Sequence, residues 1–216
     1  MSAQTTTVEI VTEPAVSLRN EPVQARSTAR LTALLDAAAS IVDEVGIERL
    51  TTAMVAERAG ASIGTVYRYF PDRIVLLQAL GSRNFERVMT RITDAINDPA
   101  HADWRAALST AFESVIYTYR TEPGFRGLRV GDQLDLRPLP NGRTHKSLVA
   151  ERIVEALSAR FGVENSAATR FTLEAALEMS DALVARAFLM NPQGDDEFIT
   201  VSTSYVRGFI MENIGW

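Results

Sequence analysis

Side chains that could bind a nucleic acid are concentrated between residues 51 and 73, where hydroxyl, guanidinium and phenol groups recur at short spacing. Ser62, Thr65 and Arg68 follow one another at intervals of three residues. On a helix this spacing places the three side chains on one side. Hydroxyl and guanidinium groups donate hydrogen bonds to base edges and phosphate oxygens. The pattern therefore indicates a short helix with a polar face that suits DNA.

The same short segment carries further groups suited to a phosphate backbone. Gly64 has no side chain, which permits close approach of its backbone to DNA. Tyr67 and Tyr69 have hydroxyls that can reach phosphate oxygens. Val66 and Phe70 lie four residues apart and can pack inward together. This division predicts a helix over Ile63–Tyr69 with its polar side exposed.

A second short helix is predicted directly before this one. Thr51 is a suitable N-cap, and the helical pattern runs through Ala59 to Gly60, which can adopt the left-handed conformation of a tight turn. Residues 51–70 therefore fit a helix-turn-helix, whose second helix lies in the major groove of DNA. Two short helices around a glycine also occur without any DNA-binding role, so the shape alone leaves both interpretations open.

Catalytic and metal-binding chemistry is poorly represented in the chain. It contains no cysteine, which excludes disulfides, thiolate zinc sites and a cysteine nucleophile, and only two histidines, His101 and His145. It has no Ser-His-Asp spacing, phosphate-binding glycine loop or carboxylate-histidine metal motif. We therefore expect neither an enzyme nor a bound metal or cofactor.

No apolar run approaches the roughly 18–20 residues of a membrane span, and residues 1–20 lack the pattern of a secretory signal. We therefore expect a cytoplasmic protein without membrane contacts.

The distribution of charge is compatible with DNA binding although the chain as a whole is acidic. The formal net charge is −5, which by itself disfavours a nucleic acid partner. Residues 21–90 carry eight arginines and eight acidic residues, whereas residues 91–216 carry thirteen basic and seventeen acidic residues. The excess of acid therefore lies in the C-terminal part, and the balanced N-terminal part can still present a basic face.

Helical periodicity dominates the chain, and no strand-like alternation of useful length occurs. Residues 1–25 are polar and contain two prolines, which indicates a flexible arm. A long first helix is expected from 27 to Gly46, and a fourth from Arg73, capped by Asp72, to about Asn97. Further helices are expected over 104–120, 149–161, 165–190 with Asn165 as its cap, and 196–214, with a loop at 135–142. The fold class is all-α, with an arm over 1–25, a helix-turn-helix domain over 26–80 and a helical bundle over 81–216.

The helix-turn-helix region is similar to the TetR family of transcriptional regulators. The run GASIGTVYRYFPDRIVLLQAL resembles the family signature, and LLDAAASIVDEVGIERLTTAMVAERAG before it resembles the family's first two helices. The similarity covers about residues 30–80. It implies a three-helix DNA-binding head, an all-helical domain that binds a small molecule, and a homodimer. We therefore expect a repressor that a small apolar or amphipathic effector releases from double-stranded operator DNA.

The resemblance also implies roles for individual residues of the head. Thr51 or Thr52 is expected to contact a phosphate, and Ser62 and Thr65 correspond to base or phosphate contacts. Tyr67, Tyr69 and Arg73 correspond to contacts with the DNA backbone, while Gly64, Arg68 and Arg30 complete the expected set. The family often has basic residues just before the Leu-Asp-Ala-Ala run, and Leu31, Thr32 and Ala33 stand there in this chain.

The C-terminal helices are expected to form both a dimer interface and a ligand cavity. The segments 165–190 and 196–214 are apolar on two faces, so each must be covered on both sides, by a partner subunit or by the chain itself. We assign the dimer interface to Leu177, Val184, Tyr205 and Phe209. Bulky side chains that could line an apolar cavity, or belong only to a packed core, are Trp104, Phe112, Ile116, Tyr119, Phe125, Phe171 and Met179, with Gln133 as a polar candidate.

Two other functions remain open at this stage. The chain could be a ligand carrier whose head has lost affinity for DNA, which the acidic net charge and the sparsely basic arm favour. It could also be an activator or a nucleoid-type DNA binder without an effector. A salt-dependent DNA titration separates the carrier from both DNA-binding alternatives.

Overall fold

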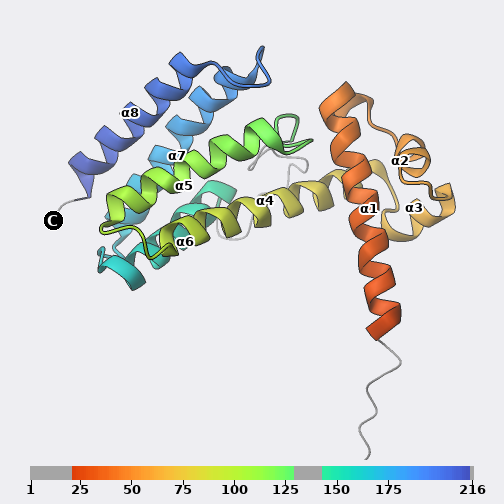
Figure 1. Ribbon diagram of the computed structural model, residues 1–216, viewed down its shortest axis with the longest axis horizontal. Coiled ribbons are helices and arrows are strands. Elements are labelled where there is room, and N and C mark those ends of the chain that lie inside the picture. Colours follow the sequence, from red (N-terminus) through yellow and green to blue (C-terminus); the bar gives the residue numbers. More distant parts are fainter. Residues whose placement is uncertain (1–20, 129–142, 215–216) are drawn as a thin grey trace, which may run out of the picture.

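The computed structural model describes residues 21–128 and 143–214, and all regular structure within them is helical. The all-α expectation is thereby confirmed. Figure 1 shows a small head and a larger bundle joined by one long helix. In chain order the elements are α1 (Glu21–Val45), the 3₁₀ turn η1 (Ile47–Arg49), α2 (Thr52–Arg58), α3 (Ile63–Tyr69), α4 (Arg73–Asn97), α5 (Trp104–Thr121), α6 (His145–Phe161), α7 (Ala167–Phe188) and α8 (Asp196–Asn213).

Side-chain caps fix the starts of the three helices that follow α1. Thr51, Ser62 and Asp72 each accept a hydrogen bond from the backbone N–H three residues further on, at 3.2, 3.1 and 2.9 Å. These bonds satisfy N–H groups that have no partner inside the helix. Gly60 between α2 and α3 has φ of +57°, the left-handed conformation that the tight turn requires. The predicted boundaries of the helix-turn-helix and of α4 are confirmed.

Three helix starts differ from the sequence-based expectation. α6 begins at His145 and not at residue 149. α1 begins at Glu21, so the last residues of the expected arm are helical. α7 is capped by Ser166, whose Oγ accepts a hydrogen bond from the Thr169 N–H at 3.1 Å, and not by Asn165. The Asn165 side chain instead accepts a hydrogen bond from Arg170 at 2.6 Å. The expected loop at 135–142 and the residue Gln133 lie outside the described residues.

The described helices enclose two separate hydrophobic cores, and α4 contributes to both. Its first half places Leu76, Leu77 and Leu80 in the core of the head, together with side chains of α1, α2 and α3. Its second half places Val88 and Ile92 in the core of the bundle, against α5, α6, α7 and α8. Burial of each such apolar side chain contributes about 1.5–3 kcal/mol to the free energy of unfolding. The two cores therefore hold α4 at both ends, and it forms a rigid connection between them (Figure 1).

The turn after α5 forms a second connection between the two cores. Phe125 belongs to the bundle core and Leu128 to the head core, and each is only 1% exposed. The buried side chain of Asn84 on α4 donates a hydrogen bond to the Leu128 carbonyl at 3.2 Å. Arg126 makes a bidentate ion pair with Asp43 of α1, at 2.6 and 2.7 Å. A displacement of this turn must therefore act on α1 as well as on α4.

Candidate DNA interface and ligand cavity

The outer face of α3 is polar and accessible, as the spacing of its residues predicts. Val66 and Phe70 are 0% and 3% exposed and fasten the helix to the head. Ser62, Gly64 and Arg68 are exposed on the other side. The polar face of α3 is thus free of contacts with the bundle and suits a groove of DNA.

Hydroxyl groups around α3 are held by hydrogen bonds that leave them able to bind a further partner. The Ser62 and Thr65 hydroxyls lie 2.9 Å apart, and Thr52 Oγ1 donates to the Tyr67 hydroxyl at 3.4 Å. The Tyr69 hydroxyl lies 3.2 Å from Ser27 Oγ on α1. A hydroxyl has one proton to donate, so the Tyr67 hydroxyl and one member of the Ser62–Thr65 pair keep theirs for a phosphate oxygen. The expected residues Thr51, Thr52, Ser62, Thr65 and Tyr67 come together on one side of the head, and their DNA contacts remain predictions.

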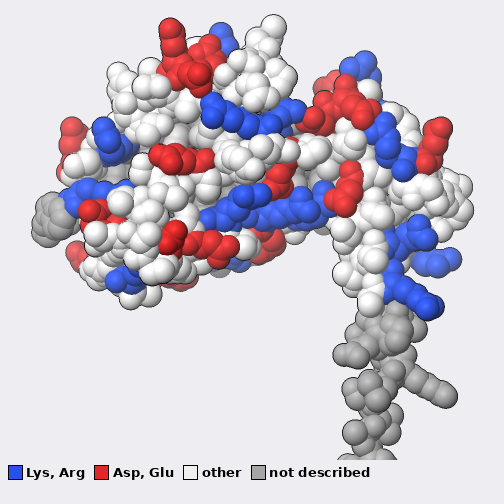
Figure 2. All heavy atoms as spheres, viewed as in Figure 1, with Lys and Arg blue, Asp and Glu red and all other residues white. Residues whose placement is uncertain are grey.

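The arginines of the head differ in how freely their side chains could contact DNA. Figure 2 shows basic side chains gathered on the head beside the N-terminal half of α1, and Arg26, Arg30 and Arg68 are exposed. Arg73 is half-buried, and its guanidinium donates a hydrogen bond to the Ile47 carbonyl. That bond fixes the turn after α1 to the start of α4. The structure therefore gives Arg73 a structural contact within the head, and does not favour its expected contact with DNA.

Arg58 is the one arginine of the described part of the head with a side-chain carboxylate partner. Its guanidinium makes a bidentate ion pair with Glu44 at 2.6 and 2.7 Å and also donates to Ser40. The hydrogen bond from Arg58 lowers the pKa of the Glu44 carboxyl below its usual range. The charge of Arg58 is therefore largely neutralised at neutral pH, in contrast to that of Arg68.

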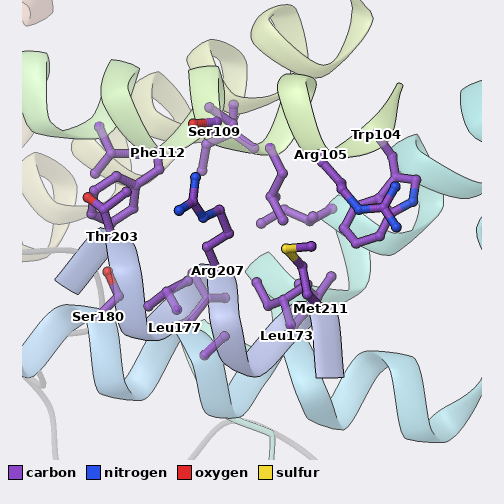
Figure 3. Close-up of a pocket in the computed structure, with 18 residues that line it drawn as sticks. Trp104, Arg105, Ser109, Phe112, Leu173, Leu177, Ser180, Thr203, Arg207 and Met211 are labelled. Carbon is purple, nitrogen blue, oxygen red and sulfur yellow. The ribbon is translucent and has the colours of Figure 1, made fainter. Parts of the chain in front are cut away.

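The bundle contains a cavity of about 130 Å³ between α5, α7 and α8. Ile92 of α4 and Ile153 of α6 also line this cavity. Most of the wall is apolar, with Trp104, Leu108, Phe112, Leu173, Val206 and Ile210 among its members. Figure 3 shows that the polar residues Ser109, Ser180, Thr203 and Arg207 project into the same space from three helices. An apolar cavity with a few polar groups is the usual form of a small-molecule site.

A second cavity of about 80 Å³ adjoins the first. The two share Ile92, Val115, Leu177 and Ser180 as wall residues. Lys146 forms one side of the second cavity and pairs with Asp181 at 3.0 Å and with Glu178 at 2.7 Å. Partial burial lowers the pKa of the Lys146 ammonium, but these hydrogen bonds outweigh burial and the pKa is raised overall. The adjoining cavities give an elongated ligand room to extend.

The residues expected to line a cavity are divided between four locations. Trp104 and Phe112 line the first cavity, and Tyr119 and Phe125 the second. Ile116 is buried in the bundle core and lines neither of the two. Phe171 and Met179, by contrast, are 69% and 37% exposed on α7. The expectation that Phe171 and Met179 line a cavity does not hold in this structure.

The expected dimer residues are similarly divided. Tyr205 on α8 is 69% exposed, whereas Phe209 packs against the bundle core and is half-buried. Val184 is only 3% exposed, and Leu177 lines both cavities. Val184 therefore faces the interior of its own chain, and Leu177 is half-buried and faces the cavities. The reason is that α7 has two apolar faces, and the helical spacing does not tell which of them is turned inward.

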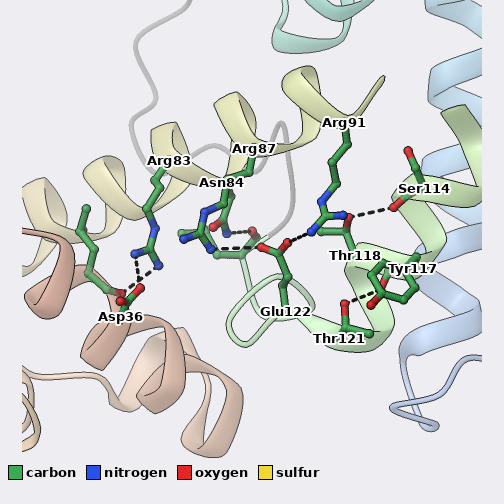
Figure 4. A network of polar contacts seen from close by, with 12 residues as sticks. Asp36, Arg83, Asn84, Arg87, Arg91, Ser114, Tyr117, Thr118, Thr121 and Glu122 are labelled. Atoms are coloured by element: carbon green, nitrogen blue, oxygen red, sulfur yellow. Dashed lines mark hydrogen bonds and ion pairs between the residues drawn. The ribbon is translucent and has the colours of Figure 1, made fainter. Parts of the chain in front are cut away.

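A row of arginines on α4 was not among the residues predicted from the sequence. Arg83, Arg87 and Arg91 are spaced by four residues, and Figure 4 shows them projecting from one side of α4. Arg87 and Arg91 both pair with Glu122 at the end of α5, and Arg83 pairs with Asp36 of α1 at 2.6 Å. The repeat at i, i+4 and i+8 was a visible signal for such a row. These pairs add polar links along the helix that joins the head to the bundle.

The described ranges contain no metal site and no membrane span. No group of three or more His, Asp or Glu side chains within them could hold a metal ion. Likewise, no helix among the described residues is long and apolar enough to cross a bilayer.

Comparison with known protein families matches both parts of the chain. Residues 34–80 match the model described as bacterial regulatory proteins, tetR family. Residues 102–211, just over half of the chain, match the model described as the tetracyclin repressor-like C-terminal domain. The two matches correspond to the head and to the bundle that holds the cavities.

Solved and curated relatives agree with these matches. A TetR-family transcriptional regulator from Streptomyces coelicolor is 35% identical, with a TM-score of 0.72 over 86% of this chain and 97% of that one. The transcriptional repressor KstR of Rhodococcus jostii is 41% identical over 58 residues, 27% of each chain. The nucleoid occlusion factor SlmA of Haemophilus ducreyi is 30% identical over 57% of this chain. The matches cover 27% of that KstR and 59% of that SlmA. With both of its parts matched, the chain belongs to the tetR family of bacterial regulatory proteins.

Proposed function

We propose that the chain is a sequence-specific DNA-binding repressor that a small amphipathic effector releases from its operator. The observation that carries this proposal is the placement of α4. Ile92 on this helix lines both cavities, while Leu76 and Leu77 on the same helix lie in the core under α3. A ligand that displaces Ile92 would therefore move the support of the DNA-binding face.

The proposed contact with DNA uses the exposed face of α3 and the N-terminus of α2. Arg68 and the hydroxyls of Ser62 and Thr65 would read base edges or bind phosphates, with Thr52 and Tyr67 on the flanking backbone. The match of residues 34–80 to the tetR family model and the similarity to the repressor KstR support this assignment. The chain would act by binding alone, without catalysis, in the cytoplasm, where bacterial DNA lies.

A homodimer is part of the proposal, because reading two successive major grooves requires two heads held about 34–36 Å apart. Among the described residues, seven of the eleven exposed large hydrophobic side chains lie on α7, on α8 or between them. These are Phe171, Met179, Leu189, Met190, Val201, Tyr205 and Met211. A surface so rich in apolar side chains is typical of a subunit interface.

The test is selection of the bound sequence from a random pool of DNA duplexes, followed by fluorescence anisotropy with the selected duplex. We expect the selected duplex to bind at least about 1000-fold more tightly than a scrambled one at the same salt concentration. Equal affinity for both duplexes would refute sequence-specific regulation. A carrier without DNA affinity would bind neither duplex.

A second candidate is a DNA binder of the nucleoid type that needs no effector. The similarity to the nucleoid occlusion factor SlmA, which spans more than half of this chain, favours it. The two candidates differ in one measurement. A repressor of the proposed kind loses operator affinity when a cavity ligand is added, whereas the second candidate retains it.

A further inference from the structure

We propose that the ligand of the first cavity is an amphipathic anion, an alkyl or arylalkyl carboxylate, whose head group is bound by Arg207. This inference rests on the proposed function, because it names the chemical class of the effector.

The ionisable side chains that line the cavity are both cationic. The wall contains two arginines, Arg105 and Arg207, and no aspartate or glutamate. Arg207 is exposed and has no ion pair with any carboxylate of the described residues. Arg120 on α5, by contrast, is half-buried and is held by Asp196 at 2.9 Å. An unneutralised guanidinium in a cavity wall favours an anionic ligand.

The position of Arg207 suits a head group at the open side of the cavity. Figure 3 shows its guanidinium reaching from α8 toward Ser109 on α5, across the space between the two helices. The Ser109 side chain makes no hydrogen bond within the part of the chain that the structure describes. A carboxylate accepts two parallel hydrogen bonds from one guanidinium and can take a further one from a hydroxyl. Arg207 and Ser109 together therefore form a suitable set of donors for one carboxylate.

The second arginine strengthens the preference for an anion without competing for the head group. Arg105 is half-buried and its guanidinium lies over the Trp104 ring, 4.7 Å from the ring centroid. The stacking holds its charge at the wall of the same cavity. A cationic ligand would meet like charge in a partly water-excluded space, whereas a neutral ligand would gain only an ordinary hydrogen bond.

The remaining wall suits a hydrocarbon tail. Leu108, Phe112, Leu173 and Val206 are among the apolar side chains around the space. Its volume of about 130 Å³ is close to that of an engineered apolar cavity, roughly 150 Å³, that binds benzene. A longer tail can continue past Leu177 into the adjoining cavity, of which Leu177 is also a wall residue.

The experiment compares three probes with the same tail and different head groups. Octanoate, 1-octanol and octylammonium are titrated into the full-length protein by isothermal calorimetry at neutral pH. We expect octanoate to bind about 10- to 100-fold more tightly than 1-octanol, because its carboxylate makes charge-assisted hydrogen bonds with the guanidinium. Octylammonium should bind most weakly. This ranking requires no variant. A 1-octanol affinity equal to or above that of octanoate overturns the proposal.

Variants then assign the preference to one side chain. Arg207→Gln should reduce octanoate affinity to that of 1-octanol and leave 1-octanol affinity unchanged, while Arg207→Lys should retain part of the preference. Ser109→Ala should weaken the binding of octanoate only a few-fold. Arg170→Gln on α7, which lies outside both cavities, is the matched control and should behave as the parent. A preference for octanoate that survives in folded Arg207→Gln refutes the assignment.

Failure of this inference can be told from failure of the proposed function. If 1-octanol releases the operator and octanoate does not, the repressor proposal stands and the carboxylate assignment falls. If the parent protein shows no specific operator, the proposed function falls, and the ranking of the three probes still decides the head group.

Discussion

Gly124 lies so close to Ala39 that a Cβ on the glycine would be 2.8 Å from both the Cα and the carbonyl oxygen of Ala39. The contact joins the turn after α5 directly to the backbone of α1. The Gly124 N–H also donates to Asp43 of α1 at 3.4 Å. No side chain separates the two backbones here, so the bundle touches the head through a contact that cannot yield by a change of rotamer.

Gly124→Ala should therefore destabilise the protein more than an equivalent change at Gly162. Both glycines have left-handed backbones, with φ of +76° and +72°, but nothing lies within 4 Å of a Cβ at Gly162. Gly162→Ala should cost about 1 kcal/mol from its backbone alone. Gly124→Ala should cost roughly 1–3 kcal/mol more because of the overlap with Ala39. Urea unfolding of both variants measures the difference, and equal costs would show that α1 and the turn are not in contact.

Arg68→Gln should weaken operator binding and flatten its dependence on salt. Each dimer would lose two phosphate or base contacts, so the slope of log K against log salt should fall by about 2. Arg58→Gln is the matched control, since Arg58 is paired with Glu44 and should not contribute to the slope. Anisotropy titrations between ~50 and ~200 mM salt provide the slopes. An unchanged slope for Arg68→Gln would remove α3 from the DNA interface.

Tyr205→Glu should convert a dimer into a monomer. Tyr205 is 69% exposed on α8, so the charge does not disturb the core of its own chain, but a charge buried between subunits costs several kcal/mol. Tyr117→Glu is the matched control, because Tyr117 is 56% exposed on α5 and its ring lies beside Arg91 of α4. Sedimentation at micromolar concentration should give a monomer for the first variant and a dimer for the second. A dimer for both would place the interface elsewhere.

The head was predictable from the sequence because its determinants are local. The caps Thr51, Ser62 and Asp72 act on groups three residues away, and the buried pair Val66 and Phe70 is spaced by one helical turn. Such contacts are visible in a short window of sequence. The starts and ends of α2, α3 and α4 were accordingly predicted to the residue or nearly so.

The bundle was less predictable because its determinants are not local. Both apolar faces of α7 have helical spacing, and only the packing of α5, α6 and α8 decides that Val184 points inward and Phe171 outward. The role of Arg73 likewise depends on the Ile47 carbonyl, 26 residues away in sequence. The cavity arginine Arg207 was missed for the same reason, since nothing near it in the sequence indicates that it faces α5.

The cavities suggest a further prediction, in which bulk added to the wall imitates a ligand. Ala111 on α5 is 3% exposed and lines the first cavity, in which Ile92 of α4 is also a wall residue. A tryptophan at position 111 would fill space close to α4 and push on the helix that supports the head. Ala106 is an exposed residue of the same helix and lines neither cavity, so Ala106→Trp adds the same side chain outside the proposed site.

Ala111→Trp should lower operator affinity about 5- to 150-fold, the usual range of an allosteric coupling, while Ala106→Trp should leave it unchanged. The reason is that a ligand, or a side chain that takes its place, can shift DNA affinity only through its different fit to the two arrangements of the head. By the same thermodynamic linkage, operator DNA should weaken the binding of octanoate to the parent protein by the factor with which octanoate weakens operator binding. Anisotropy with the selected duplex measures the first effect, and calorimetry with and without the duplex measures the second. If Ala111→Trp folds, dimerises and binds the operator as tightly as the parent, the first cavity is not coupled to the head through α4.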